Sequence, residues 1–276
     1  MKERVLEIRI TQLQSFRNHP FYVKDDEAMQ ALCDSVREYG VLSPLLVRPI
    51  GENFEIVSGH RRRAAAMKLG MDKLPVLVRD MSDDEAIILM VDSNIQRENL
   101  LPSEKAFAYK MKLDAIKHQG KTSRQFGEKW SVTQLSESGS DSERQVHRYI
   151  RLTYLAKPIL DLVDEGRIAF SPGVELSYLT KMEQAELWDI MQVEECTPSL
   201  SQAVRLKKLS QKGELTLERI SEIMSEEKAN QKERVRIEVS QIQKYFPKGY
   251  TTSQMEEKIL QMLEANYRQR QRSLNT

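Results

Sequence analysis

A glycine followed by basic side chains forms the first group of residues with clear chemical potential. Segment 56–65 runs from a strand-like stretch through Gly59 into a helix-like stretch that opens with His60 and three arginines, among them Arg61 and Arg62. A glycine lets a phosphate approach the backbone, N–H groups at a helix start point at it, and guanidinium groups donate hydrogen bonds to its oxygens. We interpret the segment as a phosphate-binding loop. The alternative is a basic helix start that is solvated or paired with acids.

Residues 131–152 have the proportions of a helix-turn-helix, in which a second helix enters the major groove of DNA. Gly139 falls in the expected turn, and residues 141–152 form the expected second helix. At about 100° per residue, Val146 and Ile150 share one face, whereas Arg148 and its basic neighbours lie near the opposite side. We therefore expect one face of this helix to pack and the other to contact DNA.

The expected DNA contacts follow from this orientation. Arginine can donate two hydrogen bonds to guanine and glutamine can pair similarly with adenine, so Ser142, Gln145 and Arg148 are the best candidates for reading bases. Further basic residues between 121 and 157 add local positive charge. The alternative is a solvated charged face. The predicted DNA-contacting set is Thr133, Gln134, Ser142, Arg144, Gln145, Arg148 and Arg151.

The composition is that of a folded, helix-rich protein. Of 276 residues, 40% are hydrophobic and 30% charged, which excludes disordered and collagen-like classes. The net charge is +1, so affinity for nucleic acid must come from a local patch. Cys33 and Cys196 lie far apart without companion metal-binding residues, so neither a cysteine metal site nor a disulfide is expected. No apolar run approaches the ~20 residues of a membrane span, so we expect a cytoplasmic protein without a membrane partner.

Residues 1–80 mix strand and helix patterns. An amphipathic pattern predicts a helix from Asp26 to Tyr39, closed by Gly40. Short runs rich in aliphatic and β-branched residues predict strands over 5–10, 44–48, 54–57 and 74–78. These elements indicate a small α/β domain.

From Ser82 the pattern is helical over most of the remaining chain. Helices are predicted over 83–91 and 102–118, the second with a proline at its first position. Side-chain oxygens that can accept unpaired backbone N–H groups predict further helix starts at Ser140, Thr180 and Thr197. The polar segment 199–233 is expected to be a helix or a linker.

The last module begins with the alternating segment 234–239 and ends in a predicted helix over 253–270. An apolar stripe on this helix predicts a dimer contact, and the alternative is packing on the strand of the same chain. The stripe consists of Met255, Ile259, Met262, Leu263 and Tyr267. The predicted domains are 1–100, binding nucleotide, 101–230, helical and binding DNA, and 231–276, the dimerisation module.

Several segments together resemble the ParB/RepB family of partition proteins. Residues 58–65, Ser-Gly-His-Arg-Arg-Arg-Ala-Ala, and residues 94–104, Asn-Ile-Gln-Arg-Glu-Asn-Leu-Leu-Pro-Ser-Glu, resemble two signature boxes of the family. Residues 40–48 are similar to its first box and residues 142–152 to its recognition helix. The implied fold class is α+β: a small mixed α/β N-terminal domain of ParB/sulfiredoxin type, an all-helical helix-turn-helix domain and a small C-terminal strand-plus-helix module.

The resemblance implies a protein that binds CTP and double-stranded DNA. In such proteins nucleotide and DNA together turn an open homodimer into a clamp, which serves plasmid, mobile-element or chromosome partition, with a ParA-type ATPase as a possible partner. By position, Asn94 would lie beside a Mg²⁺ ion, and Glu98 would help to join the loop to neighbouring helices. The residues implied to bind nucleotide are Gly59, His60, Arg61, Arg62, Ser93, Asn94 and Arg97.

Two positions depart from the family pattern. His60 and Ser93 stand where many members have glutamates that are implicated in metal binding or hydrolysis. Because Mg²⁺ prefers oxygen ligands, only Asn94, water and the phosphates would be left to hold it. We therefore expect CTP binding rather than efficient hydrolysis, and at most a slow CTPase. A structural role for His60 fits equally well.

Two other functions fit the same residues. A transcriptional or plasmid-copy regulator would use the same helix-turn-helix. An enzyme on the ParB/sulfiredoxin scaffold, a nuclease or a small-molecule kinase, would recruit Glu85, Asp92 or Glu98. A sulfiredoxin reaction itself is not expected, because it needs a cysteine nucleophile where this chain has Gly59.

Overall fold

The computed structural model describes residues 5–97, 99–120, 141–226, 239–247, 250–251, 254–255, 257–264 and 267. The chain divides into two units, one ending at Glu226 and the other beginning at Glu227.

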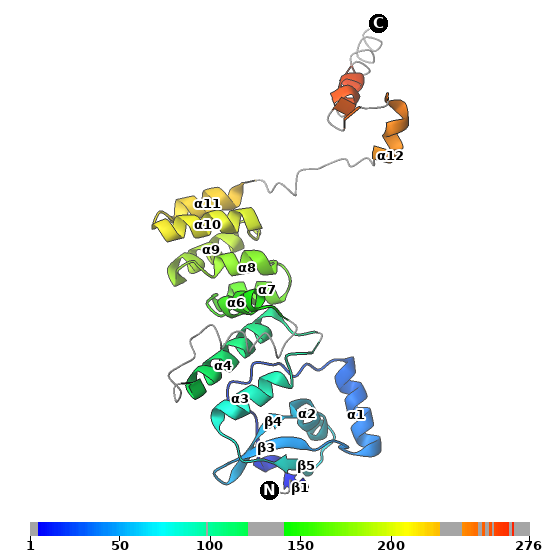
Figure 1. Ribbon diagram of the computed structural model, residues 1–276, viewed down its shortest axis with the longest axis vertical. Helices are drawn as coiled ribbons and strands as arrows, with labels where there is room; N and C mark the ends of the chain where they lie inside the picture. Colours follow the sequence, from blue (N-terminus) through cyan, green and yellow to red (C-terminus); the bar gives the residue numbers. More distant parts are fainter. Residues whose placement is uncertain are drawn as a thin grey trace. The chain divides into compact units, whose positions relative to one another are not determined.

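The N-terminal part of the first unit is built on a five-stranded mixed sheet of order β1-β5-β3-β4-β2 (Figure 1). β1 pairs antiparallel with β5, β5 parallel with β3, β3 antiparallel with β4, and β4 parallel with β2. The strands expected from the sequence are confirmed, whereas β2 has only two residues, too few for an alternating pattern. The strands are β1 (Val5–Arg9), β2 (Leu13–Gln14), β3 (Leu45–Ile50), β4 (Asn53–Ser58) and β5 (Lys73–Val78).

Two helices of the N-terminal part pack on each other, α1 (Glu27–Tyr39) and α2 (His60–Lys68). Asp26 caps α1 by accepting the N–H of Met29, and Gly40 ends it with a φ of 72°. The buried side of α1, which includes Cys33, contacts Ala65 of α2. The predicted helix over 26–39 is therefore confirmed with its cap and its stop.

The sheet and the following helices share a hydrophobic core. α3 (Asp83–Asp92) and α4 (Pro102–Gly120) pack on each other. One buried cluster joins Val57 of β4, Met90 of α3, Tyr109 of α4 and Val146 of α6 (Glu143–Leu152). The predicted domain boundary near residue 100 falls between α3 and α4, so the parts on its two sides share this cluster.

Five helices follow α6 and complete the first unit (Figure 1). One cluster contains a fully buried residue from each, namely Ile159, Leu176, Leu187, Leu206 and Ile220. The helices are α7 (Lys157–Asp164), α8 (Phe170–Leu176), α9 (Lys181–Val193), α10 (Leu200–Lys212) and α11 (Leu217–Ser225). The segment from 199 to 226, expected to be a polar helix or a linker, is thus two packed helices.

The helix starts agree in part with the capping signals in the sequence. Thr180 caps α9 with a capping box, as predicted. α10 begins after Ser199 rather than Thr197, because Ser199 and Gln202 form a reciprocal capping box. α6 begins after Ser142, whose Oγ accepts the N–H of Gln145, and Ser140 lies outside the described residues.

The second unit contains α12 (Val239–Ile242), the 3₁₀ helix η2 (Gln243–Tyr245) and helical residues between 254 and 267. The predicted strand over 234–239 lies outside the described residues except for Val239, which is helical. On the last helix Met255 is buried, whereas Met262, Leu263 and Tyr267 are 62%, 62% and 65% exposed. Among the described helices, none is long and apolar enough to cross a membrane.

Candidate functional site

The turn between β4 and α2 requires a glycine. Gly59 has a φ of 111°, and its carbonyl oxygen accepts the N–H of Arg63 in the first turn of α2. A Cβ atom at this position would lie 2.7 Å from Cγ of Leu45 and 3.2 Å from Nη2 of Arg62. The backbone therefore adopts, at the start of a helix, a conformation that side chains disfavour. Glycine is therefore required here by the positive φ and by the close approach of Leu45.

Two of the predicted nucleotide-binding arginines line one open cavity of about 580 Å³. Arg61 comes from α2 and Arg97 from the segment between α3 and α4, and Lys24 lines the same cavity. Burial, followed by the charge of Arg61, lowers the pKa of Arg97, while Glu104 opposes the shift. Because the two guanidinium groups repel each other, an anion bound between them would be stabilised. The cavity is therefore suited to a phosphate group.

Two carboxylates on the cavity wall are engaged by the protein. Asp26 accepts a hydrogen bond from Arg61 at 3.2 Å and also caps α1. Glu104 is buried and accepts the backbone N–H groups of Tyr22, at 2.6 Å, and Leu101, at 2.7 Å. The second bond is a helix-start contact, because Glu104 is the third residue of α4. Asp26 and Glu104 thereby fix the cavity wall around the cations.

Arg62 points away from this cavity lining and binds backbone instead. Its Nη1 donates to the carbonyl oxygens of Ser43, at 2.6 Å, and Pro44, at 2.9 Å. Burial lowers the pKa of Arg62. These bonds hold the segment before β3 next to the Gly59 turn. The predicted phosphate contact of Arg62 would have to compete with them.

His60 is packed as a neutral side chain. Its ring lies 3.9 Å from that of His19 between centroids, and its Nε2 accepts the N–H of Phe16 at 3.4 Å. Burial, together with the charges of His19, Arg63 and Arg97, lowers the pKa of His60 to about 3. The imidazole is therefore uncharged at physiological pH, and its contacts favour the structural role over a charged phosphate contact.

Ser93 and Asn94 lie at the end of α3 and do not line the cavity. Asn94 is buried, and its Nδ2 donates to the carbonyl oxygen of Met90 at 2.7 Å and to Oγ of Ser93 at 3.0 Å. Among the described residues no group of three or more His, Cys, Asp or Glu side chains could hold a metal ion. The Mg²⁺ contact of Asn94 stays a prediction.

The carboxylates considered for an enzyme have structural roles where they are described. Glu85 completes the capping box of α3 with Ser82. Asp92 pairs with the buried Lys112 of α4. Glu98 lies outside the described residues.

The predicted recognition helix α6 is firmly anchored on one side. Val146 and Leu152 are fully buried, and Tyr149 and Ile150 pack against the core shared by the sheet and the helices. Ser142 is exposed and caps the helix. The packing face predicted from helical spacing is confirmed. Thr133 and Gln134, in the expected first helix of the motif, lie outside the described residues.

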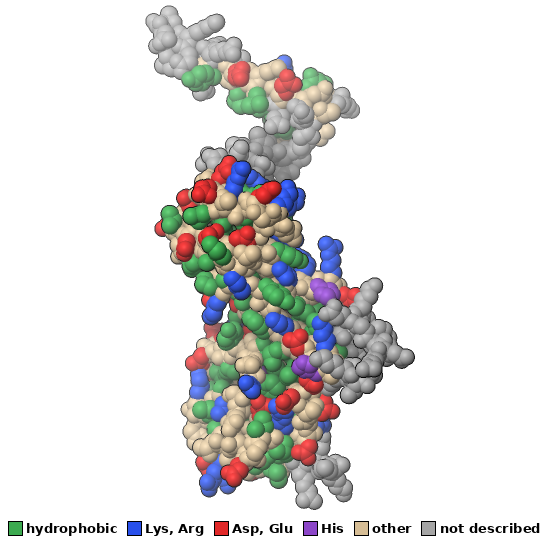
Figure 2. Space-filling model, turned by 90° about the vertical axis from the view of Figure 1, so that its left-hand side faces the viewer, with side chains coloured by type: hydrophobic (Ala, Val, Ile, Leu, Met, Phe, Trp, Pro, Cys, Tyr) green, Lys and Arg blue, Asp and Glu red, His purple; other side chains and the backbone are tan. Residues whose placement is uncertain are grey.

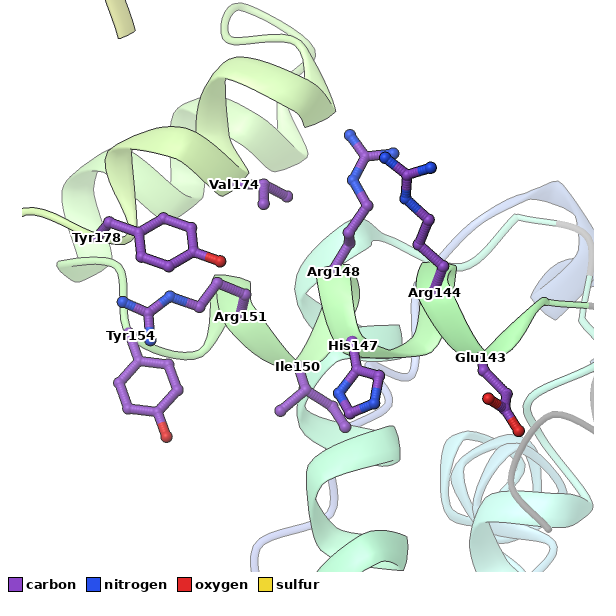
Figure 3. A pocket seen from close by; sticks show the side chains of 9 residues that line it. All are labelled: Glu143, Arg144, His147, Arg148, Ile150, Arg151, Tyr154, Val174 and Tyr178. Atoms are coloured by element: carbon purple, nitrogen blue, oxygen red, sulfur yellow. The ribbon is translucent and has the colours of Figure 1, made fainter. Parts of the chain in front are cut away.

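Two arginines extend from the other side of α6 in the same direction, Arg144 and Arg148 (Figure 3). Arg148 donates to Oε1 of Gln145 at 3.2 Å and to Oγ of Ser171 at 2.6 Å, and its guanidinium lies 4.9 Å from the ring centroid of Phe170. These contacts orient Arg148 before any ligand arrives. Basic and acidic side chains are interspersed over the face shown in Figure 2. DNA must therefore be attracted by local groups of cations such as Arg144 and Arg148, and not by the charge of the whole surface.

Arg151 does not extend with Arg144 and Arg148. Figure 3 shows its guanidinium between the side chains of Tyr154 and Tyr178. It lies 4.6 Å and 4.0 Å from their ring centroids and donates to the carbonyl oxygen of Ser177 at 2.9 Å. Arg151 therefore ties α6 to the end of α8, and its predicted DNA contact would be made from a fixed position.

Sequence reasoning did not single out Lys24, Glu104 or the two tyrosines beside Arg151. Glu104 had a usable signal, because a glutamate two residues after the helix-starting Pro102 is typical of a first turn. Tyr154 had one as well, because it lies three residues after Arg151. Tyr178 had none, because it is far from Arg151 in the sequence and meets it only through the packing of α6 and α8.

Known proteins similar to this chain share its N-terminal part and its helices. A family model described as the ParB N-terminal domain matches residues 1–95. The probable chromosome 1-partitioning protein ParB of Deinococcus radiodurans is 35% identical over 201 residues, which are 73% of this chain and 65% of that protein. Stage 0 sporulation protein J of Bacillus subtilis is 32% identical over 212 residues, 74% of this chain and 71% of that protein. The chain thus spans less than two thirds of the Deinococcus protein's length.

Two solved structures of one further protein are also similar. The C-terminally truncated chromosome-partitioning protein ParB of Caulobacter crescentus, complexed to the centromeric parS site, matches with a TM-score of 0.43 and 21% identity, covering 79% of this chain and 98% of that one. The same protein complexed with CTP-gamma-S matches with a TM-score of 0.32 and 25% identity, covering 66% and 96%.

Proposed function

The chain belongs to the ParB family of partition proteins, and on that premise we propose that it binds a specific site in duplex DNA through α6 and CTP through the Gly59 loop. Its relatives from Deinococcus and Bacillus support this, since the former is named a probable chromosome 1-partitioning protein and the two matches cover 73% and 74% of this chain. The proposed role is partition of a plasmid, mobile element or chromosome in the cytoplasm.

One observation carries the DNA-binding part of the proposal. Arg144 and Arg148, four residues apart on an anchored helix, extend in the same direction (Figure 3). A helix presented in this way fits the major groove, where arginine donates two hydrogen bonds to guanine. Gln145, held by Arg148, is within reach of an adjacent adenine in the same arrangement. We propose Arg148 as the principal base-reading residue.

The nucleotide part of the proposal rests on the cavity lined by Arg61 and Arg97. Arg61 and Arg97 are the side chains with which it would hold the triphosphate, and Lys24 adds a third cation. Bound Mg²⁺ would supply charge neutralisation of the phosphates, with Asn94 as the nearest proposed protein ligand. The neutral His60 and the hydroxyl of Ser93 offer no carboxylate, so we propose binding with at most slow hydrolysis. The preference for cytosine rests on the family resemblance, because a phosphate loop reads charge and not base.

Selection of bound duplexes from a random library, with and without CTP and Mg²⁺, tests the proposed function as a whole. We expect one palindromic sequence to be enriched, because a two-fold symmetric dimer presents two copies of α6 to two half-sites. Recovery of sequences without any shared motif would contradict sequence-specific binding. Enrichment of sites that lie in promoters, and not near an origin of replication, would favour the regulator instead.

We further propose that the protein is a homodimer held by its C-terminal module. Ile259 lies in an apolar cavity of about 420 Å³ with aromatic residues of the same unit, whereas Leu263 and Tyr267 remain exposed. An exposed apolar helix face is stabilised by burial against a second copy. A ParA-type ATPase is a further proposed partner.

Truncation near Lys232 is expected to convert the dimer into a monomer at low micromolar concentration, because it removes this face while leaving residues 5–226, a compact unit, intact. Light scattering on the full chain and the truncated chain gives the comparison. An unchanged dimer would place the interface outside the last module.

A further inference from the structure

Beside the recognition helix, two tyrosines and three cations contact one another in an alternating series. The guanidinium of Arg151 lies 4.6 Å from the ring centroid of Tyr154 and 4.0 Å from that of Tyr178. Nζ of Lys110, from α4, lies 5.3 Å from the Tyr154 ring, and Nζ of Lys207, from α10, lies 3.8 Å from the Tyr178 ring. We call these five side chains the cation–tyrosine column. It connects α4, α6, α8 and α10.

The contacts within the column leave hydroxyl and ammonium groups for a ligand. Each tyrosine ring is already attracted to two protein cations, which use the negative face of the ring. Tyr154 and Tyr178 are nevertheless 48% and 39% exposed, and Lys207 keeps 23% of its side-chain surface. Because the ring faces are engaged, stacking on a nucleic-acid base is disfavoured relative to hydrogen bonding by the hydroxyls and the ammonium groups. Phosphate oxygens are the acceptors that match these donors.

The column continues the surface of the recognition helix. A cavity of about 550 Å³ is lined both by Arg144 and Arg148 of α6 and by Tyr154 and Tyr178 of the column (Figure 3). Its lining contains three arginines and one glutamate, together with His147. A polyanion that reaches Arg148 would therefore pass beside the column. The net positive charge of the cavity lining attracts it.

Neighbouring groups determine which side chains of the column can bind a phosphate. Glu175 pairs with Lys207 at 2.9 Å, so an incoming phosphate shares this ammonium with a carboxylate. Lys181 donates to the carbonyl oxygen of Tyr154 at 3.1 Å and adds a further positive charge beside the ring. Arg151 itself is enclosed by the rings and bound to the carbonyl oxygen of Ser177. Lys207 and the tyrosine hydroxyls are therefore the groups that can reach a ligand, and Arg151 positions them.

We propose that the cation–tyrosine column binds the phosphate backbone of duplex DNA next to the groove that α6 occupies, and that it fixes the register of the helix without reading bases. This inference rests on the proposed DNA binding of α6. It assigns Arg151 a positioning role in place of a base contact. It also extends the DNA interface to α10, through Lys207.

The test is the salt dependence of binding to a random-sequence duplex, which measures phosphate contacts alone. Lys207→Gln is expected to weaken binding to random and selected duplexes by the same factor. It should also reduce the slope of log K against log salt by about 1 per protomer. The matched control is Lys208→Gln, the same change at the next, exposed residue of α10, which is expected to leave the slope nearly unchanged. Tyr178→Phe keeps the ring and removes the hydroxyl. It should weaken binding to the random and the selected duplex by the same factor.

The outcomes separate this inference from the proposed function. If the wild-type protein binds neither duplex, the proposed function itself fails. If the wild type binds and Lys207→Gln behaves like Lys208→Gln, with Tyr178→Phe unchanged, the column makes no phosphate contact and the inference is overturned. A Lys207→Gln variant that changes the preferred sequence would also overturn it, since a phosphate contact carries no sequence information. Thermal melts of the variants verify that each is folded.

Discussion

Arg148→Ala is expected to abolish the preference for the selected duplex over random DNA. A good bidentate contact to guanine is worth about 1–3 kcal/mol of discrimination, and a dimer would lose it twice. Each 1.4 kcal/mol is about tenfold in affinity, so specific binding should fall towards the level of random DNA. A gel shift on the two duplexes at one salt concentration measures the change.

Arg148→Lys is the informative control for this substitution. It retains the charge and the reach to phosphates but cannot form the paired hydrogen bonds of a guanidinium. We expect it to lose the sequence preference while keeping more affinity for random DNA than Arg148→Ala. Since Arg148 also contacts Ser171 and Phe170, a small loss of thermal stability is expected in both variants. A full sequence preference in folded Arg148→Ala would show that another residue reads the site.

Arg61→Gln is expected to weaken CTP binding strongly while leaving the initial specific complex with DNA intact. Arg61 lines the cavity and donates a hydrogen bond to Asp26, and a bound phosphate would offer the same guanidinium a further acceptor. Losing a charge-assisted hydrogen bond in a half-buried site costs about 1.5–3 kcal/mol, roughly a tenfold to hundredfold loss of affinity. Calorimetric titration with CTP and Mg²⁺ measures it.

Arg61 is a sharper choice than Arg62 for this experiment. Arg62 binds the carbonyl oxygens of Ser43 and Pro44, so its removal would loosen the strand next to the loop as well as any phosphate contact. Arg37→Gln, on the exposed side of α1, makes the same change of charge and should leave CTP affinity unaltered. Equal CTP affinity in the wild type and Arg61→Gln would place the triphosphate elsewhere.

The elements around both sites could be predicted from the sequence because their signals are local. The helix over 26–39 was bounded by Asp26 and Gly40, residues that cap a helix through contacts within a few positions. Strands β3 and β4 were bounded in the same way by Pro44, Gly51 and Gly59. The buried face of α6 followed from spacing alone, since Val146 and Ile150 need only a common direction to reach the same core.

The functional roles of individual arginines could not be predicted in the same way. Helical spacing groups Arg151 with Arg144 and Arg148, but it cannot show that Tyr178 lies beside Arg151. For Arg62 the pattern gave only a basic helix start, whereas the carbonyl oxygens that it binds come from a segment 18 and 19 residues earlier. A guanidinium has five donors and a long stem, so its partners depend on tertiary packing. Segment 199–233 was predicted only as a polar helix or a linker for a related reason: the few apolar residues within 199–226 become part of a core only when α9 packs against α11.

The coupling of a nucleotide cavity to a DNA-reading helix within one chain is tested most directly by one set of CTP titrations. The wild type, Arg61→Gln and Arg148→Ala are each titrated by calorimetry with and without the selected duplex. We expect that the duplex tightens CTP binding by the wild type, that Arg61→Gln binds CTP roughly tenfold to hundredfold more weakly than the wild type in either case, and that Arg148→Ala binds CTP weakly whether or not the duplex is present. A CTP affinity of Arg61→Gln equal to that of the wild type, or a duplex effect that survives in Arg148→Ala, would contradict this coupling.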